Sequence, residues 1–386
     1  MDRSEDPRLN VASQLQERVV LPLKAEFVGK DEIIDLMAVC LVGGEHLFLL
    51  GPPGTAKSAL VQALGRRLQG RVFDYLLTRF TEPNELFGPF DIRRLREGDL
   101  VTNTEGMLPE ASFVFLDELL NANSAILNSL LLVLNERVFR RGRETRQLPL
   151  LMAVGASNHL PQDDSLKALF DRFLVRVPCD NVSQEQLASV LQAGWVRESM
   201  NDEAPSGVTV DDIAQLQTAV ADVDVSGIRP VYLELIHRLR HAGIPVSDRR
   251  AVKFQRLIAA SALICGRAKA VASDLWVLRS TWETDEQRDV IAELVQQAID
   301  RSGDDETRIH PRSRLHAPPD AESLARDLDR IRTRAEDSSA TDAERRYLRD
   351  QLGVLAGRID WVTDAGLKTQ LQDRARGLWE RLESAP

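Results

Sequence analysis

The sequence has few aromatic residues, little cysteine and no long apolar run. Phe, Trp and Tyr make up 5% of the 386 residues, and the three cysteines, Cys40, Cys179 and Cys265, are scattered without a C-x-x-C pair. This usage is typical of a reduced, cytosolic protein. No stretch reaches the ~20 apolar residues of a membrane span, and the first residues, MDRSEDPRLN, lack the apolar region of a signal peptide. We therefore expect a cytoplasmic protein without a membrane span.

Basic residues are not in excess either. The chain has 49 Lys and Arg against 59 Asp and Glu, a formal net charge of −10. General nucleic-acid binding needs a basic face, so nucleic acid is an unlikely partner, although a local basic patch remains compatible with this charge. With 43% hydrophobic residues, the chain can bury a sizeable core, and its length suggests two or three domains.

A glycine-containing segment has the pattern of a phosphate-binding loop. Residues 51–58 read GPPGTAKS, follow the apolar run HLFLL and precede ALVQALGRRL, whose apolar positions have helical spacing. Seven of the eight positions fit G-x-x-x-x-G-K-[ST], and Ala56 stands where the pattern has glycine. This position leads into the helix, where alanine is favourable, so a methyl group is tolerable there if φ is negative.

Each residue type in this loop suits a phosphate. A helix N-terminus offers free N–H groups to an anion, and Gly51 and Gly54 let the backbone curve around it. Lys57 would supply a positive charge for the β- and γ-phosphates, and Ser58 a hydroxyl for Mg²⁺. The alternative is a simple Gly-Pro turn between a strand and a helix.

Two further apolar runs end in polar residues. FVFLDE (113–118) reads as a buried strand in which Asp117 would hold the Mg²⁺ shell and Glu118 would polarise the attacking water. The alternative is a strand with an acidic cap. LLMAVGASN (150–158) ends in Asn158, which would orient the water or simply form a turn.

An arginine follows these strands. In LFDRFLVRV (169–177), Arg172 is flanked by apolar residues. It would reach a neighbouring subunit's nucleotide as an arginine finger, or form a salt bridge with Asp171 or another nearby acid.

Together, and in this order, GPPGTAKS, FVFLDE, GASN and FDRF resemble the motifs of an AAA+ ATPase. The flanking segments FVGKDEIIDLM, TRFTEPNELFGPFDI and SDRRAVKFQRLIAASALICGR are similar to the MoxR family, and in particular to its RavA-like branch. The resemblance covers about residues 10 to 300. RavA-like members often have A-K-S at the end of the loop, so Ala56 fits them.

The resemblance implies an α/β fold with a parallel sheet, and ATP and Mg²⁺ as cofactors. It makes Asp117 and Glu118 the Walker B pair, Asn158 sensor 1, Arg172 the finger and Arg249 the sensor 2 arginine, with Arg250 as the alternative. Alternatively, residues 248–250 are only a helix N-terminus with basic residues facing solvent. It places Val28 and Gly29 beside the adenine. The expected nucleotide contacts are Val28, Gly29, Gly51, Pro52, Pro53, Gly54, Thr55, Ala56, Lys57, Ser58, Ala59 and Arg249.

Two insertions are expected within the core. Residues 81–111, with a charged tip, read as a hairpin, which by the resemblance is the helix-2 insert of the MoxR/MCM group. Residues 137–152 read as a second hairpin that turns at Arg141-Gly142. Its arginines would line a hexamer pore or belong to a solvated turn; they are Arg140, Arg141, Arg143 and Arg146.

We expect four parts along the chain: an α/β nucleotide-binding core over 1–180, a helical lid over 181–300, a linker over 301–323 and a helical C-terminal segment over 324–386. The linker is rich in Pro, Ser and charge. The last part has three apolar stripes at helical spacing. These are Leu324/Leu328/Ile331, Leu348/Leu352/Leu355/Ile359/Val362 and Leu367/Leu371/Ala375/Leu378/Leu382.

The expected reaction is the hydrolysis of ATP, aided by Glu118, Mg²⁺ and an arginine from a neighbouring subunit. The resemblance implies a hexameric ring that remodels a protein client, with a partner that carries a von Willebrand factor A domain. A nucleic-acid motor related to the MCM helicases and a nucleotide-regulated switch with little turnover are the alternatives. A GTPase is disfavoured, because the sequence has no N-K-x-D motif.

Overall fold

The computed structural model describes residues 7–96, 100–141, 144–161, 164–182, 184–199, 207–302, 310–314, 321–335 and 365–384, together with the helical positions 348, 352, 353, 355, 356 and 359. The chain forms two compact units, Met1–Ser313 and Arg314–Pro386. No helix in these ranges is long and apolar enough to cross a membrane.

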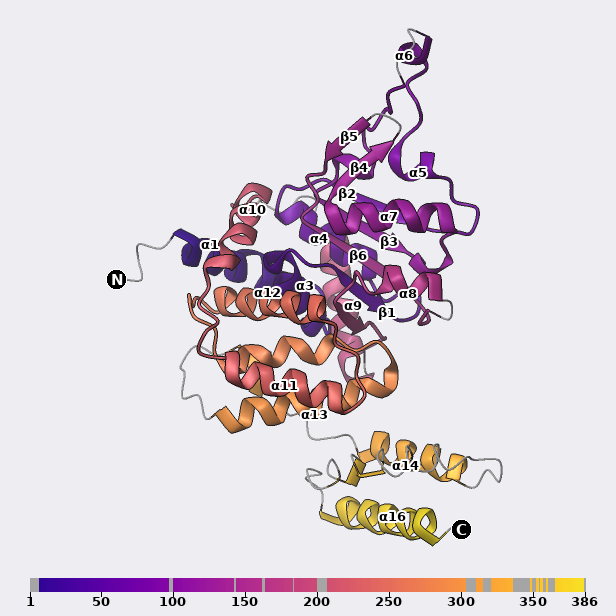
Figure 1. Ribbon diagram of the computed structural model, residues 1–386, viewed down its shortest axis with the longest axis vertical. Coiled ribbons are helices and arrows are strands. Elements are labelled where there is room, and N and C mark those ends of the chain that lie inside the picture. The colour runs from indigo at the N-terminus through magenta and orange to yellow at the C-terminus, as the bar shows by residue number, and fades with distance from the viewer. Residues whose placement is uncertain are drawn as a thin grey trace. The chain divides into compact units, whose positions relative to one another are not determined.

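A five-stranded parallel sheet lies at the centre of the first unit (Figure 1). Its strands are β1 (Leu47–Leu50), β2 (Val72–Leu76), β3 (Phe113–Asp117), β6 (Met152–Ser157) and β7 (Val175–Pro178), in the order β2-β3-β6-β1-β7. The central strands are almost fully buried, as expected for parallel strands covered on both faces. All carboxyl ends meet at one edge, called here the carboxyl edge, and all amino ends at the opposite amino edge.

Helices cover both faces of this sheet. Alternate side chains of each strand enter different cores: Leu47 and Leu49 join one apolar cluster, and Phe48 joins the other. The helices of the unit are α1 (Pro7–Leu15), α2 (Leu21–Glu26), α3 (Asp31–Gly43), α4 (Lys57–Arg67), α5 (Pro83–Phe87), α6 (Ile92–Arg96), α7 (Ser124–Glu136), α8 (Asp164–Phe170), α9 (Gln184–Ser199), α10 (Val210–Ala219), α11 (Arg229–His241), α12 (Asp248–Ile264) and α13 (Asp285–Ser302).

The two insertions are joined to each other. The first carries α5 and α6 and closes through an antiparallel bridge between Phe90 and Thr102, and α6 lies at its tip (Figure 1). The second is the antiparallel hairpin of β4 (Val138–Arg141) and β5 (Glu144–Gln147). Arg141 donates to the Gly88 carbonyl (2.7 Å) and lies over the Phe90 ring, while Arg146 donates to Thr104 Oγ1 (2.9 Å).

These contacts bear on one of the two expectations for the hairpin arginines. Arg141 and Arg146 are not simply a solvated turn, because they bind the first insertion. The pore lining stays a prediction. Burial lowers the pKa of Arg141. Arg140 forms an exposed i,i+4 ion pair with Glu136, and Arg143 lies outside the described residues.

Part of the expected linker is packed on the first unit. Helix α13 ends at Ser302, and His310 then stacks on Trp276 with ring centroids 4.3 Å apart. Arg312 pairs with the buried Asp35, which also binds Lys24. A buried carboxylate needs such partners, so Arg312 holds this segment against α3.

The second unit is helical, as expected. Its helices include α14 (Ala321–Ala335) and α16 (Ala365–Ser384). The apolar stripes read from the sequence form its core, except that Leu367 is exposed and Val362 lies outside the described residues.

Candidate functional site

The glycine-containing loop connects β1 to α4 at the carboxyl edge. Gly54 has a φ of +80° and Ala56 a φ of +66°. The negative φ that would make a methyl group tolerable at Ala56 is therefore not found. Helix α4 begins only at Lys57, so Ala56 is the residue before the helix, and the loop reverses there through the left-handed region. This conformation costs a non-glycine residue about 1–2 kcal/mol.

Cys179, the residue after β7, supports the loop from below. A Cβ at Gly51 would lie 2.3 Å from the Cys179 carbonyl oxygen, so only glycine fits there. The Cys179 N–H donates to the Leu50 carbonyl (2.7 Å), and its Sγ lies 3.4 Å from Thr55 Oγ1. From the sequence, Cys179 was noted only as a scattered cysteine. In the structure it is buried and packs against the loop.

The loop combines a buried cation with an uncapped helix. Lys57 is 5% exposed, and its Nζ donates to the carbonyls of Gly51 (2.8 Å) and Pro52 (3.0 Å). No side chain caps α4 at Ala56, so its first N–H groups have no side-chain acceptor. A buried ammonium beside free N–H groups suits a phosphate, and the exposed Pro52, Pro53 and Gly54 leave the loop accessible.

The acidic pair lies at the same edge. Asp117 is the last residue of β3, and its Oδ1 accepts the N–H of Glu118 (2.9 Å). Glu118 has a φ of +50°, a costly conformation for glutamate that turns the chain directly after the strand. Strand β6 lies between β3 and β1, and Asn158 follows its last residue with an exposed side chain.

The oxygen atoms at this edge fit Mg²⁺. Ser58 and Asp117 are half-buried oxygen donors, and Mg²⁺ commonly takes one or two protein ligands with the rest from phosphates and water. A protein cage is not needed, and among the described residues no group of three or more His, Cys, Asp or Glu could form one.

The turn of Val28 and Gly29 contacts the beginning of the lid. A Cβ at Gly29 would lie 2.7 Å from Val182 Cγ1 and 3.0 Å from Gln186 Oε1. Lys30 donates to the Asp180 carbonyl beside it. The two residues expected beside adenine therefore lie where the core meets α9.

Arg172 lies at the opposite edge of the sheet. Val175, the first residue of β7, pairs with Leu47, the first residue of β1, and Arg172 precedes it by three residues. The loop that contains Lys57 follows the last residue of β1. The sheet therefore separates Arg172 from the loop of its own chain. The salt bridge considered from the sequence is present, because Arg172 Nη1 contacts Asp171 Oδ2 at 3.4 Å.

Arg249 belongs to the amino edge as well. Helix α12 is fixed there by an ion pair between Lys253 and Glu45, the residue two before β1 (2.7 Å). Arg249 is exposed and donates to Asn135 Oδ1 near the end of α7 (2.9 Å). Burial and the nearby charge of Arg249 lower the pKa of Arg172, so the two arginines are close enough to interact.

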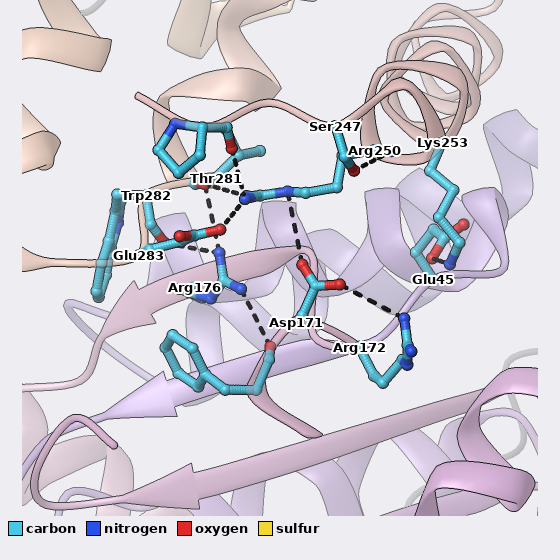
Figure 2. Close-up of polar contacts among 12 residues, drawn as sticks. Glu45, Asp171, Arg172, Arg176, Ser247, Arg250, Lys253, Thr281, Trp282 and Glu283 are labelled. Carbon is cyan, nitrogen blue, oxygen red and sulfur yellow. Dashed lines mark hydrogen bonds and ion pairs between the residues drawn. The ribbon is translucent and has the colours of Figure 1, made fainter. Parts of the chain in front are cut away.

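Arg250 has a different environment from Arg249. It is buried and binds Glu283 and the Thr281 carbonyl, on the segment that leads into α13 (Figure 2). Arg176 on β7 reaches the same segment and is fully buried, and its pKa is lowered to about 9 by burial and by Arg250. Of the two sensor 2 candidates, only Arg249 remains at the surface.

The sequence reasoning did not single out Arg176 or Glu283. Arg176 interrupts the apolar run of β7, and a charged residue inside such a run was the available signal. Glu283 had none, because its role depends on a contact with Arg250, 33 residues away.

This fold and loop define a P-loop nucleotide-binding protein of the AAA+ class. Models of two domains match the chain: the MoxR domain in the MoxR-vWA-beta-propeller ternary systems over residues 13–218, and an AAA lid domain over residues 225–295. The chain belongs to the MoxR family of AAA+ ATPases.

Individual proteins agree with this assignment. An uncharacterized protein of Methanocaldococcus jannaschii is 36% identical over 282 residues, which are 72% of this chain and 74% of the relative. The chaperone MoxR1 of Mycobacterium tuberculosis is 26% identical over 53% of this chain and 54% of its own length. A crystal structure from Cytophaga hutchinsonii, described as a candidate ATPase, has the same fold, with a TM-score of 0.61 and 18% identity over 78% of this chain and 97% of that one.

Proposed function

We propose that this protein hydrolyses ATP with Mg²⁺ and uses the energy to remodel a protein client as a homo-oligomeric ring. One observation carries the proposal: the candidate catalytic residues are divided between two opposite edges of one sheet. Lys57, Ser58, Asp117, Glu118 and Asn158 lie at the carboxyl edge, and Arg172 and Arg249 at the amino edge.

Within one chain, the carboxyl edge would bind ATP and activate water. Val28 and Gly29 would lie beside adenine, residues 51–59 would hold the phosphates, and Ser58 and Asp117 would hold Mg²⁺, which neutralises charge on the phosphates. Glu118 would polarise the attacking water, and Asn158 would orient it. This set lacks an arginine for the charge that develops on the transferred phosphate.

A second copy would supply that arginine. Its amino edge would place Arg172 as the finger and Arg249 as sensor 2 at its neighbour's loop, and a closed ring, expected to be a hexamer, would complete every site. Helix α9 supports association, because none of its described side chains is buried. It exposes Leu187 (48%), Leu191 (66%) and Trp195 (76%) at helical spacing. Such an apolar face is typical of an interaction surface.

The joined insertions are the part that we assign to the partner. The matching domain model is described from systems that contain a vWA protein, so we propose that a partner with a von Willebrand factor A domain contacts these insertions through its metal-binding site. The RavA-like branch and the cytoplasmic location stay predictions.

A second candidate function is favoured by the tip of the first insertion. Arg93, Arg94 and Arg96 on α6 are exposed there, as in a basic contact for phosphates. A nucleic-acid motor related to the MCM helicases would show turnover that nucleic acid stimulates and that salt suppresses steeply. A protein remodeller would show neither effect.

The shared site is tested by mixing inactive subunits. Arg172→Ala should bind ATP and lose at least ~10³-fold in turnover, and Glu118→Gln should bind ATP and hydrolyse it poorly. Mixtures should regain activity, because a ring can place an intact Arg172 beside an intact Glu118. Lys57→Ala should not bind ATP, but it retains Arg172, so its mixture with Arg172→Gln should also regain some activity. Full activity of Arg172→Ala alone, or no recovery on mixing, would contradict the shared site.

A further inference from the structure

Asp171, the residue before Arg172, contacts both the finger arginine and an arginine of the lid. Asp171 contacts Arg172 Nη1 through Oδ2 (3.4 Å) and Arg250 Nε through Oδ1 (3.9 Å) (Figure 2). Arg172 belongs to the core, and Arg250 belongs to the first turn of α12 in the lid. One carboxylate therefore lies between the two arginines and is attracted by both.

Two buried arginines also hold the segment Thr281–Glu283 against residues 170–172, called here the finger segment. Arg250 donates to the Thr281 carbonyl (2.8 Å) and pairs with Glu283. Arg176 donates through Nη1 to the Trp282 carbonyl (2.7 Å) and through Nη2 to the Phe170 carbonyl (3.1 Å). Figure 2 shows the side chains of Arg176, Asp171 and Arg250 converging between β7 and the lid. Phe170 and Asp171, which lead to the finger, are thus bound from the lid side and from β7.

This arrangement resists independent movement of the lid and the finger segment. The side chains of Arg176 and Arg250 are 0% and 6% exposed, and a buried charge that loses its partner is strongly destabilising. Ser247 caps α12 by accepting the N–H of Arg250 (3.2 Å), which fixes the backbone from which this side chain extends. Displacing Arg250 would leave Glu283 and Asp171 without its charge. Asp171 would then be free to pair with Arg172 alone.

We propose that Arg250 and Glu283 are positioning residues that set the place of Arg172 through Asp171. The lid of one subunit would thereby determine how well that subunit's finger reaches its neighbour's nucleotide. This inference rests on the proposed shared site and goes beyond it, because it assigns control of the finger to residues that contact neither nucleotide.

The test uses Glu283→Gln and Arg250→Met in the full chain. Both should keep the ATP affinity of the wild-type protein, since the loop is at the other edge, and kcat should fall about 10-fold to 100-fold, the effect of a small misplacement of a catalytic group. Asp285→Asn is the matched control. It is also an acid-to-amide change two residues from Glu283, but the ion pair that it removes, with Arg288, is exposed, so turnover should not change.

Mixing distinguishes positioning from a general structural defect. Each variant retains Glu118, and a Glu118→Gln subunit retains the finger, Arg250 and Glu283. A mixed ring should therefore recover turnover at the variant's own sites, and Glu283→Asp should recover part of it without mixing. A defect in folding or ATP binding would not be restored by a neighbour. Thermal unfolding checks each variant, and Glu283→Gln alone decides the question if Arg250→Met does not fold.

The outcomes distinguish failure of the positioning role from failure of the shared site. A wild-type kcat in Glu283→Gln overturns the positioning role and leaves the shared site intact. The same conclusion follows if Glu118→Gln subunits restore the turnover of Arg172→Ala but not that of Glu283→Gln. If Glu118→Gln subunits restore neither Arg172→Ala nor the lid variants, the shared site itself is wrong.

Discussion

At the scale of single residues, Ala56 is the position where the loop departs from the common sequence pattern. Its backbone also has a conformation that alanine rarely adopts. Its φ of +66° is one that glycine adopts freely. Ala56→Gly should raise the free energy of unfolding by up to ~1 kcal/mol, because the relief of the left-handed conformation exceeds the extra freedom that glycine gains in the unfolded chain. ATP affinity should be retained.

The matched variant is Ala56→Val, since β-branched side chains tolerate this region least. It should lower the free energy of unfolding by about 1 kcal/mol or more and weaken ATP binding. Urea denaturation and calorimetric titration measure both quantities. A lower stability for Ala56→Gly than for the natural protein would show that the loop does not adopt this backbone.

His46 is a second residue with a measurable consequence. It is fully buried, its Nε2 donates to the Leu134 carbonyl (3.0 Å), and its Nδ1 accepts the Ala153 N–H (3.1 Å). Only the neutral ring can do both. Burial is the main cause that lowers the pKa of His46 to about 3 in the folded protein, against about 6.5 in the unfolded chain.

The direction in which stability changes with pH follows from proton binding. Between pH 6.5 and 3 the unfolded chain protonates this ring and the folded protein does not, so stability is lost as pH falls, by about 1.4 kcal/mol per pH unit from this residue. His46→Gln, which can also donate and accept, should unfold with a shallower pH dependence between pH 6 and 4. Denaturant titrations at several pH values compare the slopes, and equal slopes would contradict the assignment.

At the scale of elements, α9 is a helix that buries little within its own chain. Most helical stability in proteins comes from packing of an apolar face, so this helix is expected to pack against another copy. Leu191→Glu and Trp195→Glu should weaken assembly with ATP and lower turnover. The stability of the single subunit should stay within ~0.5 kcal/mol, because both side chains are exposed.

Light scattering over a range of protein concentrations measures the assembly. Gln192→Glu is the control, since it adds the same charge at an exposed polar position of the same helix. Wild-type assembly of Trp195→Glu would assign the apolar face to another role, and equal weakening by Gln192→Glu would point to charge alone.

At the scale of the whole molecule, the two units have separate cores. Among the described residues, the buried members of the first unit's apolar clusters end at Ala298, and those of the second unit's cluster begin at Leu324. A chain of residues 1–313 should therefore fold cooperatively and bind ATP with unchanged affinity. Calorimetry and thermal unfolding test this, and loss of either property would show that the helical second unit completes the fold of the first.

Much of the site could be read from the sequence, because its chemistry is carried by neighbours in the chain. GPPGTAKS after an apolar run predicted the strand, the loop and α4, and FVFLDE predicted β3 with Asp117 and Glu118 at its end. The periodicity of the last 60 or so residues predicted the apolar core of the second unit. In each case local preferences and burial require the same arrangement.

The tertiary structure decided what depends on contacts between distant residues. It gave Ala56 a positive φ, joined the two insertions through Arg141 and Arg146, and packed Arg312 on Asp35. It also separated two adjacent arginines, turning Arg249 toward Asn135 at the surface and Arg250 toward Glu283 in the interior. Sequence alone could not distinguish them, because the residues that pair with each arginine are brought near only by the packing of α12 between the core and the segment before α13.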